Sequence, residues 1–176
     1  MATLQETHPA PLKAGLDREW IATEFAKGIV AEDNLHHDAL ARAEAPPDAS
    51  LSVFYHDMAA ADARHRDIVE MIATRYGHNP KNSGGGGIGE ALRGIKDKVS
   101  EMGMHPIHKL AADLSAKANA IHWTRAWVDT FEAIADSESA RELSAVLVEE
   151  TAHHEILQKA FGTLLLRGAQ GDKSGS

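Results

Sequence analysis

Two motifs in this 176-residue chain combine a carboxylate with an imidazole three residues later: Asp62-x-x-His65 and Glu150-x-x-His153. On an α-helix this spacing places both groups on one face. Both motifs lie in the middle of long helical patterns, on the side expected to face the core. Because a buried carboxylate or imidazole is costly unless it is paired or binds a metal ion, the two motifs predict a buried polar site.

A third carboxylate, Glu32, interrupts an apolar helical stripe in the same way, with His36 one turn later. Glu32 lies 14 residues before Pro46, and Asp62 lies 15 residues after Pro47. Equal counts from a tight turn mean equal heights in an antiparallel helical hairpin, so the two carboxylates should face each other.

Counting residues from Ser137 places polar residues of the second half of the chain at the same height in the bundle. Glu150 and His153 lie 13 and 16 residues after it, and His122 lies 15 residues before it. The sequence therefore predicts one polar layer at mid-height of a bundle. The helical period directs His122 about 100° away from the inward line of its helix, so we expect this histidine at the surface.

Helical periodicity predicts four long helices and no strands, which makes the chain all-α. The helices are expected over 17–45, 48–76, 106–136 and 139–167. Their ends are indicated by capping and helix-breaking residues: Asp17, Pro46-Pro47, Asp48 or Ser50, Gly77, Pro106, and a capping box of Ser139 with Glu142. Tight turns join the first two and the last two helices into antiparallel hairpins. The connection between the hairpins is long enough to cross the bundle and contains a short helix over 88–101.

The composition suits one globular domain, with 43% hydrophobic and 25% charged residues. We expect the bundle over 16–168, a flexible arm over 1–15 and a disordered tail over 169–176. No apolar run approaches the roughly 18 residues of a membrane span, and no signal peptide is recognisable. The absence of cysteine excludes disulfides and thiolate chemistry, and it favours a cytoplasmic location. The net charge of −8 argues against nucleic-acid binding.

The third helical pattern lacks an inward glutamate at mid-height and has Lys117 there instead. A lysine directed at carboxylates neutralises them and repels a second divalent ion. Beside this position lies an aromatic arc of Trp123, Trp127 and Phe131. The arc is equally consistent with core packing and with a dimer interface.

These residues give the chain its resemblance to the ferritin-like di-iron carboxylate superfamily, in particular to the rubrerythrin and bacterioferritin pattern. In that pattern the four helices contribute a Glu, an E-x-x-H motif, a Glu and a second E-x-x-H motif. The metal ligands that the resemblance implies are Glu32, Asp62, His65, Glu150 and His153. The resemblance covers residues 17–167, and it implies a ferritin-like up-down four-helix bundle whose long crossover carries the short extra helix.

The chain departs from that pattern at two positions. Lys117 stands where the third helix would carry its glutamate, and Asp62 is one methylene shorter than a glutamate. A di-iron site uses four carboxylates and two histidines, whereas this chain offers three carboxylates and two histidines. The site is therefore expected to hold one or two ions of Fe or Mn, or none. The possible accessory groups are His36, Lys117, His122 and His154.

The resemblance implies a metal-binding protein: a di-iron or mono-metal oxidase or peroxidase, or a stress protein that handles iron or peroxide. Its partners would be Fe(II) or a small oxidant, and it would form a homodimer or a larger homo-oligomer. The alternative is a metal-free ferritin-like structural or interaction module, in which Lys117 neutralises the buried carboxylates. A cage-forming ferritin is a third option, less favoured because no fifth helix follows.

Overall fold

The computed structural model describes residues 16–79 and 105–171, and every regular element within these ranges is a helix. The four long helices are α1 (Arg18–Glu44), α2 (Ser52–Arg75), α4 (Pro106–Ala133) and α5 (Ser137–Ala169). A short 3-10 turn, η1 (Ala49–Leu51), precedes α2. The all-α prediction is confirmed for the described residues, and none of their helices is long and apolar enough to cross a membrane. The arm, the crossover helix over 88–101 and residues 172–176 lie outside the described ranges.

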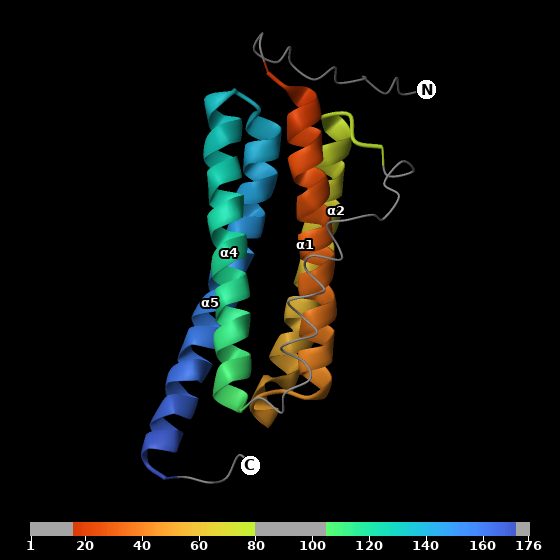
Figure 1. The fold of residues 1–176 in the computed structure, drawn as a ribbon. Coiled ribbons are helices and arrows are strands. Elements are labelled where there is room, and N and C mark those ends of the chain that lie inside the picture. The colour runs from red at the N-terminus through yellow and green to blue at the C-terminus, as the bar shows by residue number, and fades with distance from the viewer. Residues whose placement is uncertain (1–15, 80–104, 172–176) are drawn as a thin grey trace, which may run out of the picture.

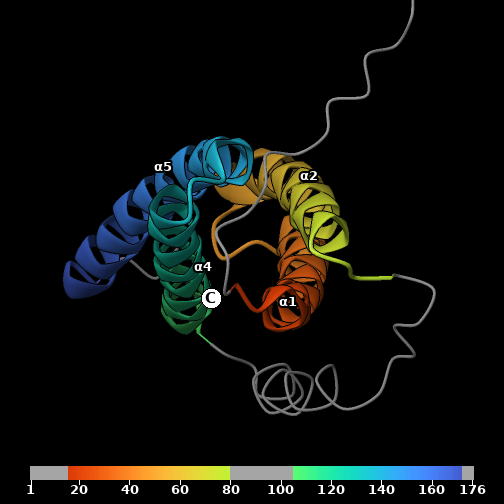
Figure 2. The same cartoon turned by 90° about the horizontal axis from the view of Figure 1, so that it is seen from above.

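The helices form two antiparallel hairpins, α1 with α2 and α4 with α5 (Figure 1). Seen from above, they follow one another around the bundle in the order α1, α2, α5, α4 (Figure 2). The end of α2 and the start of α4 lie at opposite ends of the bundle, as two hairpins joined by a long crossover require. Each hairpin therefore brings two helices of opposite direction to the same central layer.

Local chemistry sets most of the helix ends where the sequence predicts them. The Asp17 side chain accepts a hydrogen bond from the Trp20 N–H at 2.9 Å and caps α1. Asp48 caps η1 through the Ser50 N–H at 3.0 Å. Gly77 follows α2 with φ of 108°, a conformation in which an L side chain is strained.

The predicted capping box of Ser139 and Glu142 is wrong. α5 begins earlier, and the Asp136 side chain accepts from both the N–H of Ser139 (3.1 Å) and its hydroxyl (2.7 Å). Glu142 instead accepts hydrogen bonds from the Arg75 guanidinium on α2, at 3.0 and 2.9 Å. Asp136 is an equally favourable capping residue and lies at the observed start of α5, and the ion pair with Arg75 occupies the glutamate that the box would have used.

Two apolar clusters fill the bundle, one toward each end, and the buried charged residues lie between them with His65. The first contains buried residues from all four helices: Ile21, Ala22, Phe25, Val69, Ile72, Ala73, Tyr76, Trp127, Val128, Phe131, Ala140 and Leu143. The second also draws on all four helices: Ala39, Ala43, Leu51, Tyr55, Met58, Ala59, Leu110 and Leu157. This division places the polar layer at mid-height, as the turn counts predict.

Aromatic side chains fill the space between α1 and α4. The Phe25 ring lies 4.8 Å from Trp127 and 5.2 Å from Trp123, measured between ring centroids. Trp127 and Phe131 belong to the first apolar cluster, and Trp123 packs against it. Of the two readings of this arc, core packing within one chain is the one observed.

Candidate metal centre

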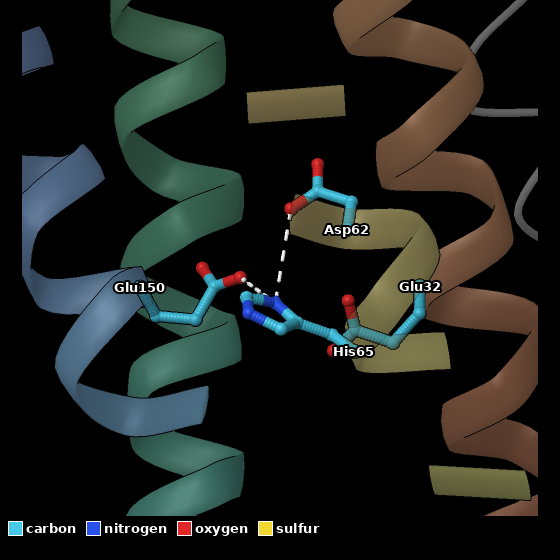
Figure 3. A group of neighbouring side chains, drawn as sticks. All are labelled: Glu32, Asp62, His65 and Glu150. Atoms are coloured by element: carbon cyan, nitrogen blue, oxygen red, sulfur yellow. Dashed lines mark hydrogen bonds and ion pairs between the residues drawn. The ribbon is translucent and has the colours of Figure 1, made fainter. Parts of the chain in front are cut away.

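Four buried side chains from three helices converge at mid-height: Glu32 from α1, Asp62 and His65 from α2, and Glu150 from α5 (Figure 3). We call this group the buried cluster. Each residue offers one potential ligand atom, and these four atoms all lie within 4.8 Å of one another. None of the four residues is more than 4% exposed. The structure therefore brings together four of the five residues predicted as metal ligands.

Lys117 on α4 faces the same point. Its Nζ donates to Asp62 Oδ1 at 2.6 Å and to Glu150 Oε1 at 2.9 Å, and the lysine is 1% exposed. Burial opposes the charged ammonium, but the Glu150 and Asp62 carboxylates outweigh this effect and raise the pKa of Lys117. The prediction that Lys117 points inward is confirmed, and its charge sits between two of the three carboxylates.

His65 has a carboxylate at each ring nitrogen. Its Nδ1 lies 3.0 Å from Glu150 Oε1 and 4.0 Å from Asp62 Oδ1, as the dashed lines in Figure 3 mark. Its Nε2 lies 3.1 Å from Oε2 of Glu149. Burial opposes protonation of the imidazole, but the hydrogen bond to Glu150 and the charges of the nearby carboxylates outweigh burial and raise the pKa of His65.

The three carboxyl groups differ in protonation because they differ in partners. Burial, reinforced by the charge of Glu150, raises the pKa of Glu32 to about 8. Burial also raises the pKa of Asp62, although Lys117 opposes this shift. Burial acts on Glu150 as well, but hydrogen bonds from His65 and Lys117 outweigh it and lower the pKa of this carboxyl. At neutral pH, without a metal ion, Glu32 is therefore mainly the neutral acid.

Each carboxyl group of the buried cluster keeps one oxygen without a hydrogen-bond partner in the structure. These oxygens are Glu32 Oε2, Asp62 Oδ2 and Glu150 Oε2. Buried polar atoms are normally satisfied, so each such atom calls for a ligand, an ion or a water molecule. The carboxyl groups themselves come together, because one ligand atom of each lies within 4.8 Å of the others, so a bound cation would compensate them.

The remaining histidines lie outside the buried cluster. His153 packs its ring against Phe54, with 5.8 Å between ring centroids, and its buried Nδ1 has no partner in the structure. Burial and the charge of Lys117 lower the pKa of His153. His36 Nδ1 donates to the carbonyl of Ala59 at 2.8 Å.

His122 is exposed and bonds the carbonyl of Ala118 at 2.7 Å, which confirms the prediction of a surface histidine. His154 is partly exposed on α5 and is not a member of the buried cluster.

Glu149 is the residue that sequence reasoning missed. Its carboxylate accepts from His65 and, at 2.9 Å, from the Arg64 guanidinium. Glu149 precedes Glu150 on α5, so the helical period turns it away from the inward line. A tertiary contact with α2 brings it to His65, and no periodic signal in the sequence marks such a contact.

A scan of protein-family models, a search of curated proteins and a search of solved structures each gave no match. The described residues form a four-helix bundle with a buried carboxylate–histidine cluster, an arrangement compatible with a ferritin-like fold.

Proposed function

We propose that the protein binds one divalent transition-metal ion, Fe(II) or Mn(II), in the buried cluster. The supporting observation is that Glu32, Asp62, His65 and Glu150 each offer a ligand atom within 4.8 Å of the other three. Each of the three carboxyl groups also has a buried oxygen without a hydrogen-bond partner, which is costly in the interior, and a divalent cation would compensate these carboxylates. Three carboxylates with one imidazole form an oxygen-rich donor set with a single nitrogen, which suits Mn(II) and Fe(II).

The charges of the layer balance for one divalent ion. A metal ligand must be deprotonated, so binding requires an ionised Glu32 and a neutral His65. The three carboxylates then carry three negative charges, and Lys117 with one divalent ion carries three positive charges. A second divalent ion would leave an uncompensated charge of +2 in the interior, which is strongly unfavourable. The ammonium of Lys117 thus fits one ion and opposes a second.

The burial of the cluster limits what can react there. A bound Fe or Mn ion supplies Lewis-acid and one-electron redox chemistry. With every ligand at most 4% exposed, the co-reactants that suit the site are small molecules such as dioxygen or a peroxide. We therefore propose a mono-metal oxidoreductase or a protein that handles iron or peroxide.

Metal content per chain tests this proposal. The metal-free protein is incubated anaerobically with Fe(II) or with Mn(II), passed through a desalting column and measured by elemental analysis. We expect one equivalent of metal. Glu32→Gln removes a ligand and leaves both hydrogen bonds of Lys117 in place, so it should weaken binding more than the roughly 10–100-fold that losing an outer partner of a ligand costs.

The matched control for Glu32→Gln is Glu155→Gln. Glu155 is an exposed glutamate on α5 and is not a member of the buried cluster. This variant should bind metal as the wild type does. A wild-type protein that retains no stoichiometric Fe or Mn after reconstitution would refute the metal-binding proposal.

The contacts of Lys117 favour a second candidate, a metal-free interaction module. With Glu32 neutral, Asp62 and Glu150 are balanced by Lys117 and a protonated His65, so the layer carries no net charge without metal. Buried ion pairs of this kind also specify how helices align. In this candidate the protein acts through contacts with a second copy or another protein, and elemental analysis finds no metal.

A further inference from the structure

A metal ion that binds in the buried cluster must travel there from water. All four cluster residues are buried, and so is Lys117 beside them. His65 links this interior to a partly exposed carboxylate, because one ring nitrogen faces Glu150 and the other faces Glu149. The Glu149 side chain is 44% exposed, whereas that of His65 is 2% exposed.

Glu149 presents a negative charge at this surface. Its carboxylate accepts hydrogen bonds from Arg64 and His65. The Arg64 guanidinium, on a side chain that is 60% exposed, lies 2.9 Å from the carboxylate. An ion pair this exposed contributes little stability, so solvent cations can displace the guanidinium at small cost.

We propose that Glu149 is the uptake ligand of the buried cluster: it takes a divalent cation from solvent in place of Arg64 and passes it inward past His65. The inference rests on the proposed function, since it names how the ion reaches that site. The step is a ligand exchange. The cation first binds the Glu149 carboxylate in place of a bound water molecule, and it then leaves Glu149 for the oxygens of Glu150 and Asp62. The Arg64 guanidinium competes with the entering cation for the Glu149 carboxylate. The imidazole ring of His65 then rotates so that the cation can pass to the buried cluster.

Uptake kinetics of Co(II) test this assignment, because its visible absorption changes when carboxylate and imidazole ligands replace water. Metal-free protein is mixed with Co(II) by stopped flow at physiological ionic strength, where long-range attraction is screened. Glu149→Gln removes the charge but keeps an oxygen that accepts the His65 hydrogen bond. Uptake by this variant should slow about tenfold, the lower end of the range that focused charge gives to association rates, because salt screens much of that focusing.

Two further measurements distinguish a role of Glu149 in the rate of metal uptake from a role in metal affinity. Because a route carries ions in both directions, release of Co(II) to a chelator should slow in Glu149→Gln by a similar factor, and affinity should change little. Refolding Glu149→Gln in the presence of Co(II) should fill the site to the wild-type level, because the metal then binds before the route closes. Arg64→Ala removes the competitor and should speed uptake, whereas the control Glu155→Gln should match the wild type.

Distinct results would overturn the assignment. If Glu149→Gln binds Co(II) at the wild-type rate, or loses affinity through faster release alone, Glu149 only orients His65. If Arg64→Ala does not accelerate uptake, Arg64 is not the competing cation. A wild-type protein that fills only on refolding would retain the proposed function but lose the route. A wild-type protein that holds no Co(II) even after refolding would lose both.

Discussion

Glu32 differs from the other carboxyl groups of the buried cluster because no basic side chain donates to it in the described structure. Lys117 pairs with Asp62 and Glu150, and His65 pairs with Glu150. Glu32 therefore bears the cost of burial with little compensation, and its pKa rises to about 8. Folding without metal consequently favours the protonated form of this residue.

The stability of the metal-free protein should fall as pH rises from about 4.5 to about 8. In this window folded Glu32 holds a proton that the unfolded chain has released, since its pKa rises from 4.5 to about 8 on folding. The free energy of unfolding should drop by up to roughly 1.4 kcal/mol per pH unit from this group and level off above its folded pKa. Urea unfolding with a chelator at a series of pH values measures the slope.

Glu32→Gln provides the control, because its amide does not titrate. Protonation of His65 gives a slope of the same sign, since its pKa is also raised on folding and its stabilising charge is lost at higher pH. The difference between wild type and Glu32→Gln isolates the share of Glu32. Parallel pH profiles for the two proteins would contradict the raised pKa.

Lys117 should decide how many metal ions the site accepts. Lys117→Glu supplies a fourth carboxylate and removes the ammonium, so it should raise metal uptake from one to two equivalents per chain. Without metal this variant should lose at least the roughly 3–5 kcal/mol that follows from removing one partner of a buried ion pair. Elemental analysis and urea unfolding with and without Mn(II) measure both effects.

Lys117→Met separates charge from ligation in that experiment. It removes the ammonium but adds no carboxylate, so it should be destabilised without metal and bind no more than one ion. A Lys117→Glu protein that folds and still binds a single ion would show that the geometry of the layer, rather than the charge of Lys117, limits the stoichiometry.

At the residue scale, counting from the turns predicted Glu32, Asp62 and Glu150 at one height, because rise per residue is fixed in a helix. The three-residue spacing placed His65 on the face of Asp62, and the helical period placed Lys117 inward. Sequence reasoning did not distinguish His153 from the residues of the buried cluster, although its ring packs on Phe54 outside that cluster. Rotamers and tertiary contacts decide whether an inward residue reaches a given point, and the helical period does not contain them.

At the scale of the elements, a glycine in α1 sets how closely α4 packs against it. A Cβ built on Gly28 would lie 2.9 Å from Cη2 of the Trp123 ring and 3.1 Å from Cγ1 of Val69. Gly28 precedes Glu32 by one helical turn, so the indole lies against α1 just beside the polar layer. A residue that weakens a helix by itself is here a requirement for packing.

Gly28→Ala should destabilise the protein by about 1–3 kcal/mol, because the added methyl overpacks a contact made with a rigid indole. Gly162→Ala in α5 is the matched control, since a Cβ there meets no atom within 4 Å. That control should gain about 0.5–1 kcal/mol from helix propensity alone. Thermal unfolding of both variants measures the contrast, and a stabilised Gly28→Ala protein would contradict the close approach.

Sequence patterns predicted the helices better than the interactions at their ends. Period and breakers gave both ends of α1 and the end of α2 to within a residue, because Asp17, Pro46 and Gly77 act locally. The start of α2 was placed too early, since Asp48 caps the 3-10 turn η1 and α2 begins at Ser52. The start of α5 was misread because Glu142 bonds Arg75 across the bundle, a contact between residues far apart in sequence.

At the scale of the whole molecule, a tyrosine near each end of the bundle joins one hairpin to the other: Tyr55 in the first turn of α2 and Tyr76 just after its last residue. The Tyr55 hydroxyl donates to Asp113 Oδ2 on α4 at 2.6 Å, and Arg42 of α1 donates to the same carboxylate at 3.1 Å. The Tyr76 hydroxyl donates to Asp136 Oδ2 at 2.8 Å. Side-chain hydrogen bonds thus connect the two hairpins near both ends of the bundle, and the polar layer lies between these two connections.

The two connections should differ in strength, because the environments of their carboxylates differ. Burial raises the pKa of Asp113, whose side chain is only 11% exposed, so Tyr55→Phe removes a hydrogen bond from a carboxylate shielded from water, although Arg42 still pairs with it. We expect a loss of about 1.5–3 kcal/mol, as for hydrogen bonds to charged groups. Asp136 keeps two hydrogen bonds from Ser139 when Tyr76 is replaced, so Tyr76→Phe should cost about 0.5–1.5 kcal/mol.

Amide hydrogen exchange shows whether each loss stays at its own end of the bundle. Because proteins open in local cooperative units, Tyr55→Phe should speed exchange in the helix turns around the second apolar cluster, which contains Tyr55. Tyr76→Phe should speed exchange around the first cluster instead. If both variants accelerate the same amides throughout the chain, the bundle opens as one unit, and the polar layer couples the two ends rather than separating them.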